Sequence, residues 1–341
     1  MKYSGIDLHS NNSVVTVIDE EDRVVAEKRL PNDLGTVLKF LAPWQAELGG
    51  VVVESTYNWY WLVDGLQEAG YRVHLAHPVA VRKYDGLKHA GDQTDARYLA
   101  HLLRLKILPT GTILPKEDRA ARDLGRKRIQ LVRCRSAQIV AIENIMARHR
   151  GMRISGNQIK TMSAQDIDQA AGQLGLDADV TLAVRSQLAV IATLNAEIER
   201  LEKRLQERVK MRPEYAVLTT APGIGRALAT TIALETGPLE RFASEGKYAS
   251  YARCVNSMHT SNGKKKGQGN SKNGNKYLAW AYVEAAHFAR RYCVQAQRFY
   301  ERKQAQTNTM VATKALAHKL ARACYHMMKE GKPFDVTRCF A

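Results

Sequence analysis

Apolar residues in the first 31 positions come in three short runs with the two-residue period of β-strands. The runs are "KYSGID", "SVVTVID" and "RVVAEKRL", and "EED" between the last two is a turn signal. Alternation of this kind sends successive side chains to opposite faces of a sheet. The pattern predicts a meander of three strands at the start of the chain.

Between residues 33 and 107 the pattern changes to helical spacing, interrupted by two more strands. "DLGTVLKFLAPWQAEL" is helical with Asp33 as a cap, "GGVVVEST" is a continuous apolar run typical of a buried central strand, and "YRVHLAHP" is a further strand. Helices are predicted for "YNWYWLVDGLQEAG", "PVAVRKYDGLK" and "DQTDARYLAHLLRLKI". The order β-β-β-α-β-α-β-α predicts a mixed α/β domain over residues 1–110.

Two long helices are predicted in the middle of the chain, over residues 116–149 and 177–209. The second carries a heptad-like apolar seam, made by Val184, Leu188, Ile191, Leu194, Ile198, Leu201 and Leu205. We expect the pair to form an antiparallel helical hairpin, or coiled coil, in a domain over residues 111–210. The seam fits packing within the hairpin as well as dimerisation between two copies, and we expect both.

The C-terminal segment, residues 211–341, is predicted to be a mainly helical domain. "LTTAPGIGRALATTIALETG" has a short helix, a tight "PGIG" turn and a second helix, which together make a helix-hairpin-helix-like element. At the turn glycines, Gly223 and Gly225, backbone N–H groups are open to a nucleic-acid phosphate. Residues 257–276 are rich in Gly, Asn, Ser and Lys and predict a flexible basic loop. Helices are expected after it, from near Asn275, over 296–306 and over 309–330.

Composition adds a polyanionic partner to this outline. The net charge is +17 and the isoelectric point is about 9.7. Residues 1–110 have 12 Lys and Arg against 14 Asp and Glu, whereas residues 211–341 have 21 against 8. We therefore expect nucleic acid to be bound mainly by the C-terminal part. The five cysteines form no CxxC pair, and no run reaches the roughly 18 apolar residues of a membrane span, so we expect a cytoplasmic protein with reduced thiols and no membrane partner.

Four acidic residues stand where the predicted elements of the first domain can bring them together. Asp7 ends the first strand and Glu54 ends the buried central strand. Asp92 and Asp95, three residues apart, begin the last helix. Ligand sites in open α/β sheets form at strand ends, and clustered carboxylates repel one another unless a hard cation neutralises them. The set predicts a site for one or two Mg²⁺ or Mn²⁺ ions, with capping of the helix N-terminus as the structural alternative for the two aspartates.

The ordered motifs "GIDLHSNNSVVTVID", "VVVEST", "DQTDARYLA", "APGIG" and the late Ser/Gly/Lys loop resemble the DEDD transposases of bacterial insertion sequences. The resemblance covers nearly the whole chain. It implies that residues 1–110 have the RNase H-like fold of the RuvC type. It also implies that the catalytic residues and metal ligands of this domain are Asp7, Glu54, Asp92 and Asp95.

The resemblance extends to a serine in the C-terminal domain. Relatives carry a serine followed by glycine and basic residues, then a Ser-Lys-x-Gly-Asn segment, and here the stretch reads "HTSNGKKKGQGNSKNGN". Ser261 is thereby implied to be the nucleophile that forms a phosphoserine link to DNA, opposite carboxylates from another subunit. The alternative is a loop serine that only contacts phosphate. Further nucleic-acid contacts are expected at Lys264, Lys265, Lys266, Ser271, Lys272, Asn275 and Lys276.

The predicted function is that of a transposase, a DNA recombinase that excises and integrates its own insertion sequence by metal-assisted phosphoryl transfer. The resemblance further implies double-stranded DNA as substrate, a structured non-coding RNA as guide, a nucleoid location, and a homodimer that becomes a tetramer in the synaptic complex. Alternatives within enzymes are a junction-resolving endonuclease, which needs the carboxylates but not Ser261, and a site-specific DNA invertase. A non-catalytic nucleic-acid-binding protein is the alternative from another class. The histidines near the motifs, His9, His89 and His259, are given no catalytic role.

Overall fold

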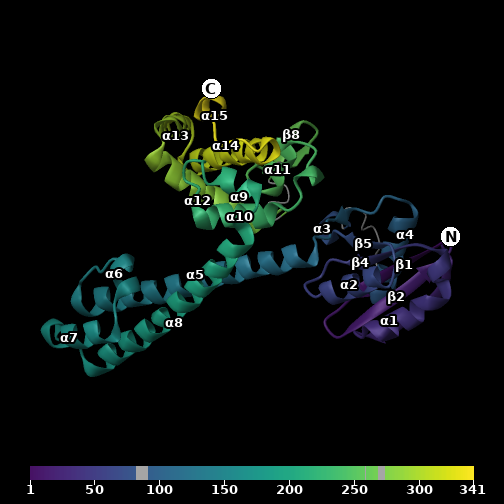
Figure 1. Cartoon of the computed structure of the whole chain (residues 1–341), viewed down its shortest axis with the longest axis horizontal. Helices are drawn as coiled ribbons and strands as arrows, with labels where there is room; N and C mark the ends of the chain where they lie inside the picture. Colours follow the sequence, from purple (N-terminus) through teal and green to yellow (C-terminus); the bar gives the residue numbers. More distant parts are fainter. Residues whose placement is uncertain (82–90, 258, 268–272) are drawn as a thin grey trace. The chain divides into compact units, whose positions relative to one another are not determined.

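The computed structural model describes residues 1–81, 91–257, 259–267 and 273–341. The chain divides into two compact units, Met1–Ile113 and Leu114–Ala341, and each is described by itself (Figure 1). The predicted domain limits, including a boundary at residue 210, stay predictions. Among the described residues, no helix is both long enough and apolar enough to cross a membrane.

A six-stranded mixed sheet forms the centre of the N-terminal unit, in the order β3-β2-β1-β4-β5-β6. Its strands are β1 (Lys2–Leu8), β2 (Asn12–Ile18), β3 (Val24–Pro31), β4 (Leu48–Glu54), β5 (Val73–Ala76) and β6 (Thr110–Gly111). The first three form the predicted antiparallel meander, β4 is parallel to β1 and to β5, and β6 is antiparallel to β5. This sheet is consistent with the RNase H-like fold that the resemblance implies. The two-residue β6 was not predicted, because so short a segment has no readable period.

The helices of this unit are α1 (Leu34–Leu41), α2 (Tyr60–Glu68), α3 (Pro78–Val81) and α4 (Asp92–Arg104). Asp33 caps α1 as predicted, because its side chain accepts a hydrogen bond from the backbone N–H of Thr36 at 2.7 Å. The α-helix is shorter than predicted and continues as a 3₁₀ turn, Ala42–Glu47, since Pro43 cannot donate to an α-helical ladder. The helix predicted over "PVAVRKYDGLK" is described only as far as Val81, and the rest of that prediction lies outside the described residues.

One face of the sheet carries the main core of the unit, where α1 and α2 pack on the strands. From the two central strands this core takes Ile6, Leu8, Val51 and Val53, all at most 1% exposed. Burial of each such side chain is worth roughly 1.5–3 kcal/mol. Because successive strand residues point to opposite faces, the residues between these four face the other side of the sheet.

Helix α4 packs on that other face and comes very close to β1 at Gly5. A Cβ atom at Gly5 would stand 1.9 Å from the backbone oxygen of Ala96 and 2.8 Å from the backbone nitrogen of Ala100. Only a residue without a side chain allows a helix backbone to approach a strand in this way. Since α4 begins at Asp92 and Asp7 is two residues beyond the glycine, this contact sets the separation between the two parts of the predicted acidic cluster.

The second unit begins with a long helical hairpin. Helices α5 (Lys116–Arg150) and α8 (Ala178–Val209) pack along each other, as the pattern predicted (Figure 1). Three seam residues, Val184, Leu188 and Ile191, are at most 1% exposed within the single chain. Packing of the hairpin on itself is therefore one use of the seam, and dimerisation through it stays a prediction.

Two short helices join the long ones, in a segment that the pattern left as a looser connection. They are α6 (Gly156–Thr161) and α7 (Ala164–Leu174). Each begins with a capping box. The serine hydroxyl, of Ser155 or Ser163, accepts a hydrogen bond from the backbone N–H three residues further on, and the side chain of that residue accepts one from the backbone N–H of the serine. The start signals Ser-x-x-Gln and Ser-x-x-Asp were present in the sequence, but the apolar runs behind them are short.

The remainder of the second unit is mainly helical, with a short β-hairpin. Its helices are α9 (Pro213–Leu218), α10 (Arg226–Thr236), α11 (Glu245–Tyr251), α12 (Lys276–Tyr292), α13 (Val294–Gln306), α14 (Thr309–Glu330) and α15 (Val336–Phe340). They enclose an apolar core in which Tyr248 and Tyr282 are fully buried. The two phenol oxygens are 2.7 Å apart, and that of Tyr248 is 3.0 Å from Oγ1 of Thr236, so these buried polar groups satisfy one another.

The expected flexible loop over residues 257–276 contains a β-hairpin, so that prediction was wrong for this part of the segment. β7 (His259–Ser261) pairs antiparallel with β8 (Lys264–Gly267). The connecting residues, Asn262 and Gly263, have φ of 50° and 69°, the left-handed conformation at both central positions of a type I′ turn. Asn-Gly between two short segments is a hairpin signal, and the Gly- and Lys-rich composition around it obscured that signal.

Gly5→Ala should destabilise the N-terminal unit by about 3 kcal/mol, because the added methyl group overlaps the backbone of α4. Urea denaturation followed by tryptophan fluorescence measures the loss, since three of the four tryptophans, Trp44, Trp59 and Trp61, lie in this unit. Gly35→Ala is the matched control, because a Cβ there meets only the Asp33 side chain, at 3.5 Å. An unfolding midpoint for Gly5→Ala no lower than that of the unsubstituted protein would contradict the close contact.

Candidate active site

Asp7 and Glu54 lie beside each other because their strands are neighbours. β1 and β4 are parallel and the residues just before these two are paired in register, so both carboxyl groups reach the same edge of the sheet. The two groups share a hydrogen bond, and Asp7 is only 4% exposed. Burial, the bond to Glu54 and the nearby negative charges raise the pKa of Asp7 to about 7, against the opposing effect of His9. Burial is the largest of these causes, so ionisation of Asp7 is disfavoured mainly because its carboxylate is removed from water.

His9 is a member of this cluster that the sequence reasoning did not assign. Its Nε2 atom is 3.2 Å from Oδ2 of Asp7 and 3.4 Å from Oδ2 of Asp92. One ligand atom from each of the three residues lies within 4.8 Å of the others. The signal that could have identified His9 is its place two residues after Asp7, which puts both side chains on the same side of an extended chain.

Asp92 and Asp95 come from the first turn of α4. In the described chain this helix begins after Gly91, whose backbone is extended and which offers no side-chain cap. Asp92 is therefore the first helical residue and not the cap, although acidic charge in a first turn still favours a helix by about 0.3–1 kcal/mol. Asp95 is exposed, and its charge is close enough to contribute to the raised pKa of Asp7.

Arg29 of β3 brings positive charge to the edge of the cluster. Its Nη2 donates to Oδ2 of Asp92 at 2.5 Å, and its Nη1 donates to Oδ1 of Asn12 at 2.6 Å. This hydrogen bond, aided by the charge of His9, holds the pKa of Asp92 below its usual range. The pKa values of Asp7 and Asp92 are therefore shifted in opposite directions, because Asp7 is buried among carboxyl groups and Asp92 is paired with a guanidinium.

This set of donors suits a hard divalent cation. The four predicted carboxylates offer oxygen, which Mg²⁺ and Mn²⁺ prefer, and His9 offers an imidazole nitrogen. Burial and the neighbouring carboxyl groups keep the pKa of Asp7 well above its ordinary value, and a bound cation would offset both effects. The residues present therefore fit a cation site of the predicted kind, and the identity of the ion stays a prediction.

Ser261 is the last residue of β7 and stands immediately before the type I′ turn. Its side chain is exposed, and across the hairpin it pairs with Lys264. Directly opposite residues of an antiparallel pair have Cβ atoms about 4.5–5.5 Å apart, so the ammonium group of this lysine can reach a phosphate bonded to the serine. Ser261 belongs to the second unit and the carboxylates to the first.

Apart from Asn275, the predicted nucleic-acid contacts around this serine fall into three groups. Lys264, Lys266 and Lys276 are exposed, as a phosphate contact requires. Lys265 lies on β8, where its backbone pairs with that of Thr260. The remaining two predicted contacts, Ser271 and Lys272, lie outside the described residues.

Asn275 has a structural position that differs from the predicted nucleic-acid contact. It is 8% exposed, and its Oδ1 accepts hydrogen bonds from the backbone N–H groups of Tyr277 and Leu278 at 2.9 and 3.1 Å, which caps α12. Its Nδ2 donates to Oε2 of Glu235 at 2.7 Å. Glu235 in turn accepts two hydrogen bonds from Arg126 of α5, at 2.6 and 2.8 Å. The side chain thus holds the start of α12 in place, because its polar groups are engaged inside the protein.

The two glycines of "PGIG" are needed for different reasons. Gly223 has φ of +80°, and a Cβ there would stand 2.3 Å from the backbone oxygen of Ala285, so the turn packs directly on α12. Gly225 is the N-cap of α10, with open space around its Cα and no side-chain cap. The first N–H groups of α10 are therefore uncovered by a capping side chain, which is compatible with the predicted phosphate contact.

The predicted site residues of each unit fall within matches to known families. A family model for DEDD transposases of the IS110 type, described as "Transposase", matches residues 4–150, which include all four carboxylates. A model described as "Transposase IS116/IS110/IS902 family" matches residues 215–301, which include Ser261. A "Probable family 20 transposase" of Pseudomonas aeruginosa is 24% identical over 329 residues, which cover 95% of this chain and 96% of that protein. These matches follow the order of the motifs along the chain, and the chain belongs to the DEDD transposase family of bacterial insertion sequences, of the IS110 type.

Proposed function

We propose that this transposase excises and integrates its own insertion sequence through metal-assisted phosphoryl transfer with Ser261 as the nucleophile. Membership of the family already makes it an enzyme that cuts and rejoins DNA. The observation that carries the metal-dependent part is the touching pair of carboxyl groups, Asp7 and Glu54, with the pKa of Asp7 raised to about 7. Strongly perturbed carboxyl groups of this kind gather at functional sites, where a bound cation removes their repulsion.

In this proposal Asp7, Glu54, Asp92 and Asp95 hold one or two Mg²⁺ or Mn²⁺ ions. When bound, such ions stabilise negative charge on the oxygens of a transferring phosphoryl group. The protein's own part is to fix the ligands: two neighbouring strands carry the first pair, and the first turn of α4 carries the second. Arg29 adds positive charge at the edge of the cluster, where it can bind a DNA phosphate.

The serine step keeps atoms and charges in balance. The Ser261 hydroxyl gives up its proton as Oγ bonds to phosphorus, and the deoxyribose oxygen that leaves takes up a proton and becomes a hydroxyl group. The reverse attack, by the hydroxyl of another DNA end on the phosphoserine, restores the serine and forms a new phosphodiester. No external energy source is needed, because one phosphodiester bond is exchanged for another. An exposed serine beside Lys264 on a hairpin fits this role.

The proposed partners follow from charge and from the two-part site. Residues 111–210 carry 18 Lys and Arg against 12 Asp and Glu, and residues 211–341 carry 21 against 8, which supports binding of duplex DNA and of a structured guide RNA there. With a guide RNA, base pairing selects the sequence while the protein reads shape and backbone. A site completed by Ser261 of one subunit and carboxylates of another requires a homodimer, and joining of two DNA molecules favours a tetramer.

Asp7→Asn should lower the yield of excised circles by roughly 10³-fold, because several kcal/mol of charge stabilisation are lost at about 1.36 kcal/mol per factor of ten. Quantitative amplification across the circle junction, in a bacterial host that carries the gene with its native flanks, measures the yield. Glu68→Gln, an exposed position on α2, is the matched control and should keep the full yield. An undiminished yield from Asp7→Asn would remove the metal-dependent proposal and favour the non-catalytic alternative.

Ser261→Ala should abolish both the covalent protein–DNA adduct and the circle junction, because no other group on the hairpin turn supplies this hydroxyl. The melting temperature should stay the same, since the side chain is exposed. A denaturing gel of end-labelled DNA detects the adduct, and Thr260→Ala, at the exposed preceding residue, is the control. Junctions that persist in Ser261→Ala would show that the serine is not the nucleophile, and DNA cut without rejoining would favour the endonuclease alternative.

Replacing Lys264 and Lys266 together by alanine should weaken binding of duplex DNA and make it less sensitive to salt. Each lost phosphate contact lowers the slope of log affinity against log salt by about one, so the double variant should lose about two. Fluorescence anisotropy with a labelled duplex over a range of salt concentrations gives the slope. Lys39→Ala, an exposed lysine on α1, should leave the slope as it is. Equal slopes for all three proteins would mean that these lysines are only a solvated charge run.

A further inference from the structure

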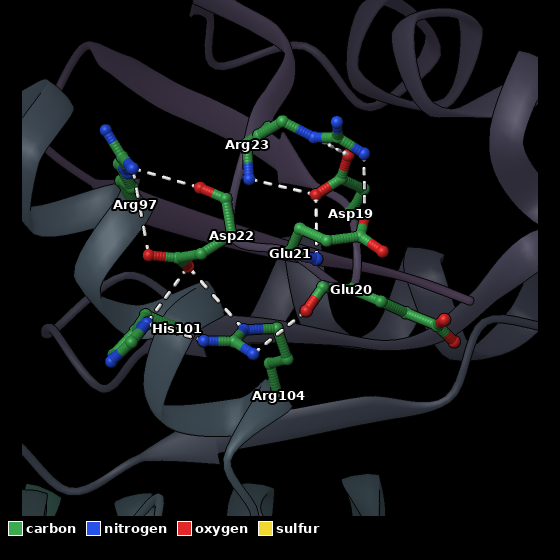
Figure 2. Close-up of polar contacts among 8 residues, drawn as sticks. All are labelled: Asp19, Glu20, Glu21, Asp22, Arg23, Arg97, His101 and Arg104. Carbon is green, nitrogen blue, oxygen red and sulfur yellow. Dashed lines mark hydrogen bonds and ion pairs between the residues drawn. The ribbon is translucent and has the colours of Figure 1, made fainter.

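The turn between β2 and β3 has a rigid internal structure. Oδ1 of Asp19 accepts hydrogen bonds from the backbone N–H groups of Glu21 at 3.0 Å and Arg23 at 2.9 Å, and Nε of Arg23 donates to Oδ2 of Asp19 at 2.8 Å. Asp22 has φ of 67°, a left-handed conformation that Asp and Asn adopt more readily than most residues. Figure 2 shows the result: the Asp22 carboxylate is directed to side chains of α4 and takes no part in the bonds within the turn.

Three basic side chains of α4 meet this turn, and their spacing of four and then three residues puts them on one face of the helix (Figure 2). Nη2 of Arg97 donates to the backbone oxygen of Asp22 at 2.9 Å, and Nδ1 of His101 is 2.9 Å from Oδ1 of Asp22. Nη1 of Arg104 donates to the backbone oxygen of Glu20 at 3.0 Å, and its Nε is 3.6 Å from Oδ1 of Asp22. Asp22 is thus the shared partner of all three side chains.

The apolar packing of α4 on β1 is close but non-directional, and the directional contacts of this helix are polar ones, at the β2–β3 turn and between Arg29 and Asp92. At the crossing, the contact is between Gly5 and the helix backbone at Ala96 and Ala100. A contact of this kind has no projecting side chain to interlock with the strand, so it opposes sliding and rotation of the helix only weakly. Leu99 and Leu103 add buried apolar area, but that contribution is non-directional. The polar contacts at the turn are directional, and they act on the same helix.

We propose that Asp22 is a positioning residue that fixes the axial position and the rotation of α4, and thereby holds Asp92 and Asp95 opposite Asp7. This inference rests on the proposed role of those residues in cation binding. A helix rises 1.5 Å per residue, so Arg97 is only about 7.5 Å along the axis from Asp92, and a rigid helix transmits the constraint. A cation site needs its ligands held to within about 0.5 Å, which a sliding helix does not provide.

The proposal is tested by isothermal titration calorimetry, in which the Mn²⁺ affinity of the full chain is compared with that of the Asp22→Asn variant. Asparagine keeps the left-handed backbone of the turn and removes the charge that α4 binds. We expect the Mn²⁺ affinity to fall about tenfold, as for loss of a group that orients metal ligands. The Mg²⁺ concentration for half-maximal circle formation should rise by a similar factor, with the yield restored at saturating Mg²⁺. Glu21→Gln is the matched control, because its carboxylate pairs with Arg23 inside the turn.

Unchanged Mn²⁺ affinity in Asp22→Asn, whatever its melting temperature, would show that the turn only stabilises the fold and would overturn the proposal. Should Asp22→Asn fail to fold, Arg97→Gln takes its place, since that side chain is 49% exposed and lies outside the turn. Asp7→Asn in the same titration separates the two ideas. Loss of Mn²⁺ binding in Asp7→Asn but not in Asp22→Asn would reject the positioning role of Asp22 and leave the proposed cation site standing. Unchanged binding in Asp7→Asn rejects the cation site itself.

Discussion

The close approach of α4 to β1 at Gly5 is the contact on which the candidate active site depends. Strand residues supply one pair of carboxyl groups and the helix supplies the other, so the site exists only if helix and strand touch. A side chain at Gly5 would meet the backbone at Ala96, and the helix would have to move away. Because no side chain projects from β1 at this point, the surface between strand and helix is smooth. The polar contacts of the β2–β3 turn with α4 supply a directional restraint on the position of the helix.

Electrostatics then divides the cluster into two environments. Asp7 is buried next to Glu54 and resists ionisation, whereas Asp92 is half exposed and is kept ionised by Arg29. A cation bound between them would offset the desolvation of the Asp7 carboxylate and its repulsion from Glu54 and Asp95. This is the physical reason for the proposal that the cluster holds a cation.

The Ser261 hydroxyl group of the second unit stands in a different structural setting. Ser261 stands on a short hairpin whose two turn residues have a left-handed backbone, and the next described helix, α12, is capped by Asn275. The cap, Asn275, is bound to Glu235, and Glu235 is bound to Arg126 of the long hairpin. Loss of Arg126 would leave the buried Glu235 carboxylate unpaired, at a cost of about 3–5 kcal/mol. The exposed Ser261 thus precedes, along the chain, a helix whose first residues are held by a buried polar network.

The sequence by itself determined the strands and helices with strong periodicity, since these depend on local pattern. It also predicted four carboxylates and a serine as site residues, from motifs that follow one another in order. The tertiary structure decided what depends on register and on elements distant in sequence. His9 joined the site because a strand continues past Asp7, and Arg29 because β3 lies within reach of the start of α4. Asn275 was predicted from its motif to contact nucleic acid. In the structure it caps α12 and is buried against Glu235, a residue 40 positions away that the sequence pattern does not connect to it. Residue types and spacings show which chemical groups the chain offers. Which of these groups come into contact is decided by packing, because many of the stabilising contacts join side chains that are far apart in the sequence.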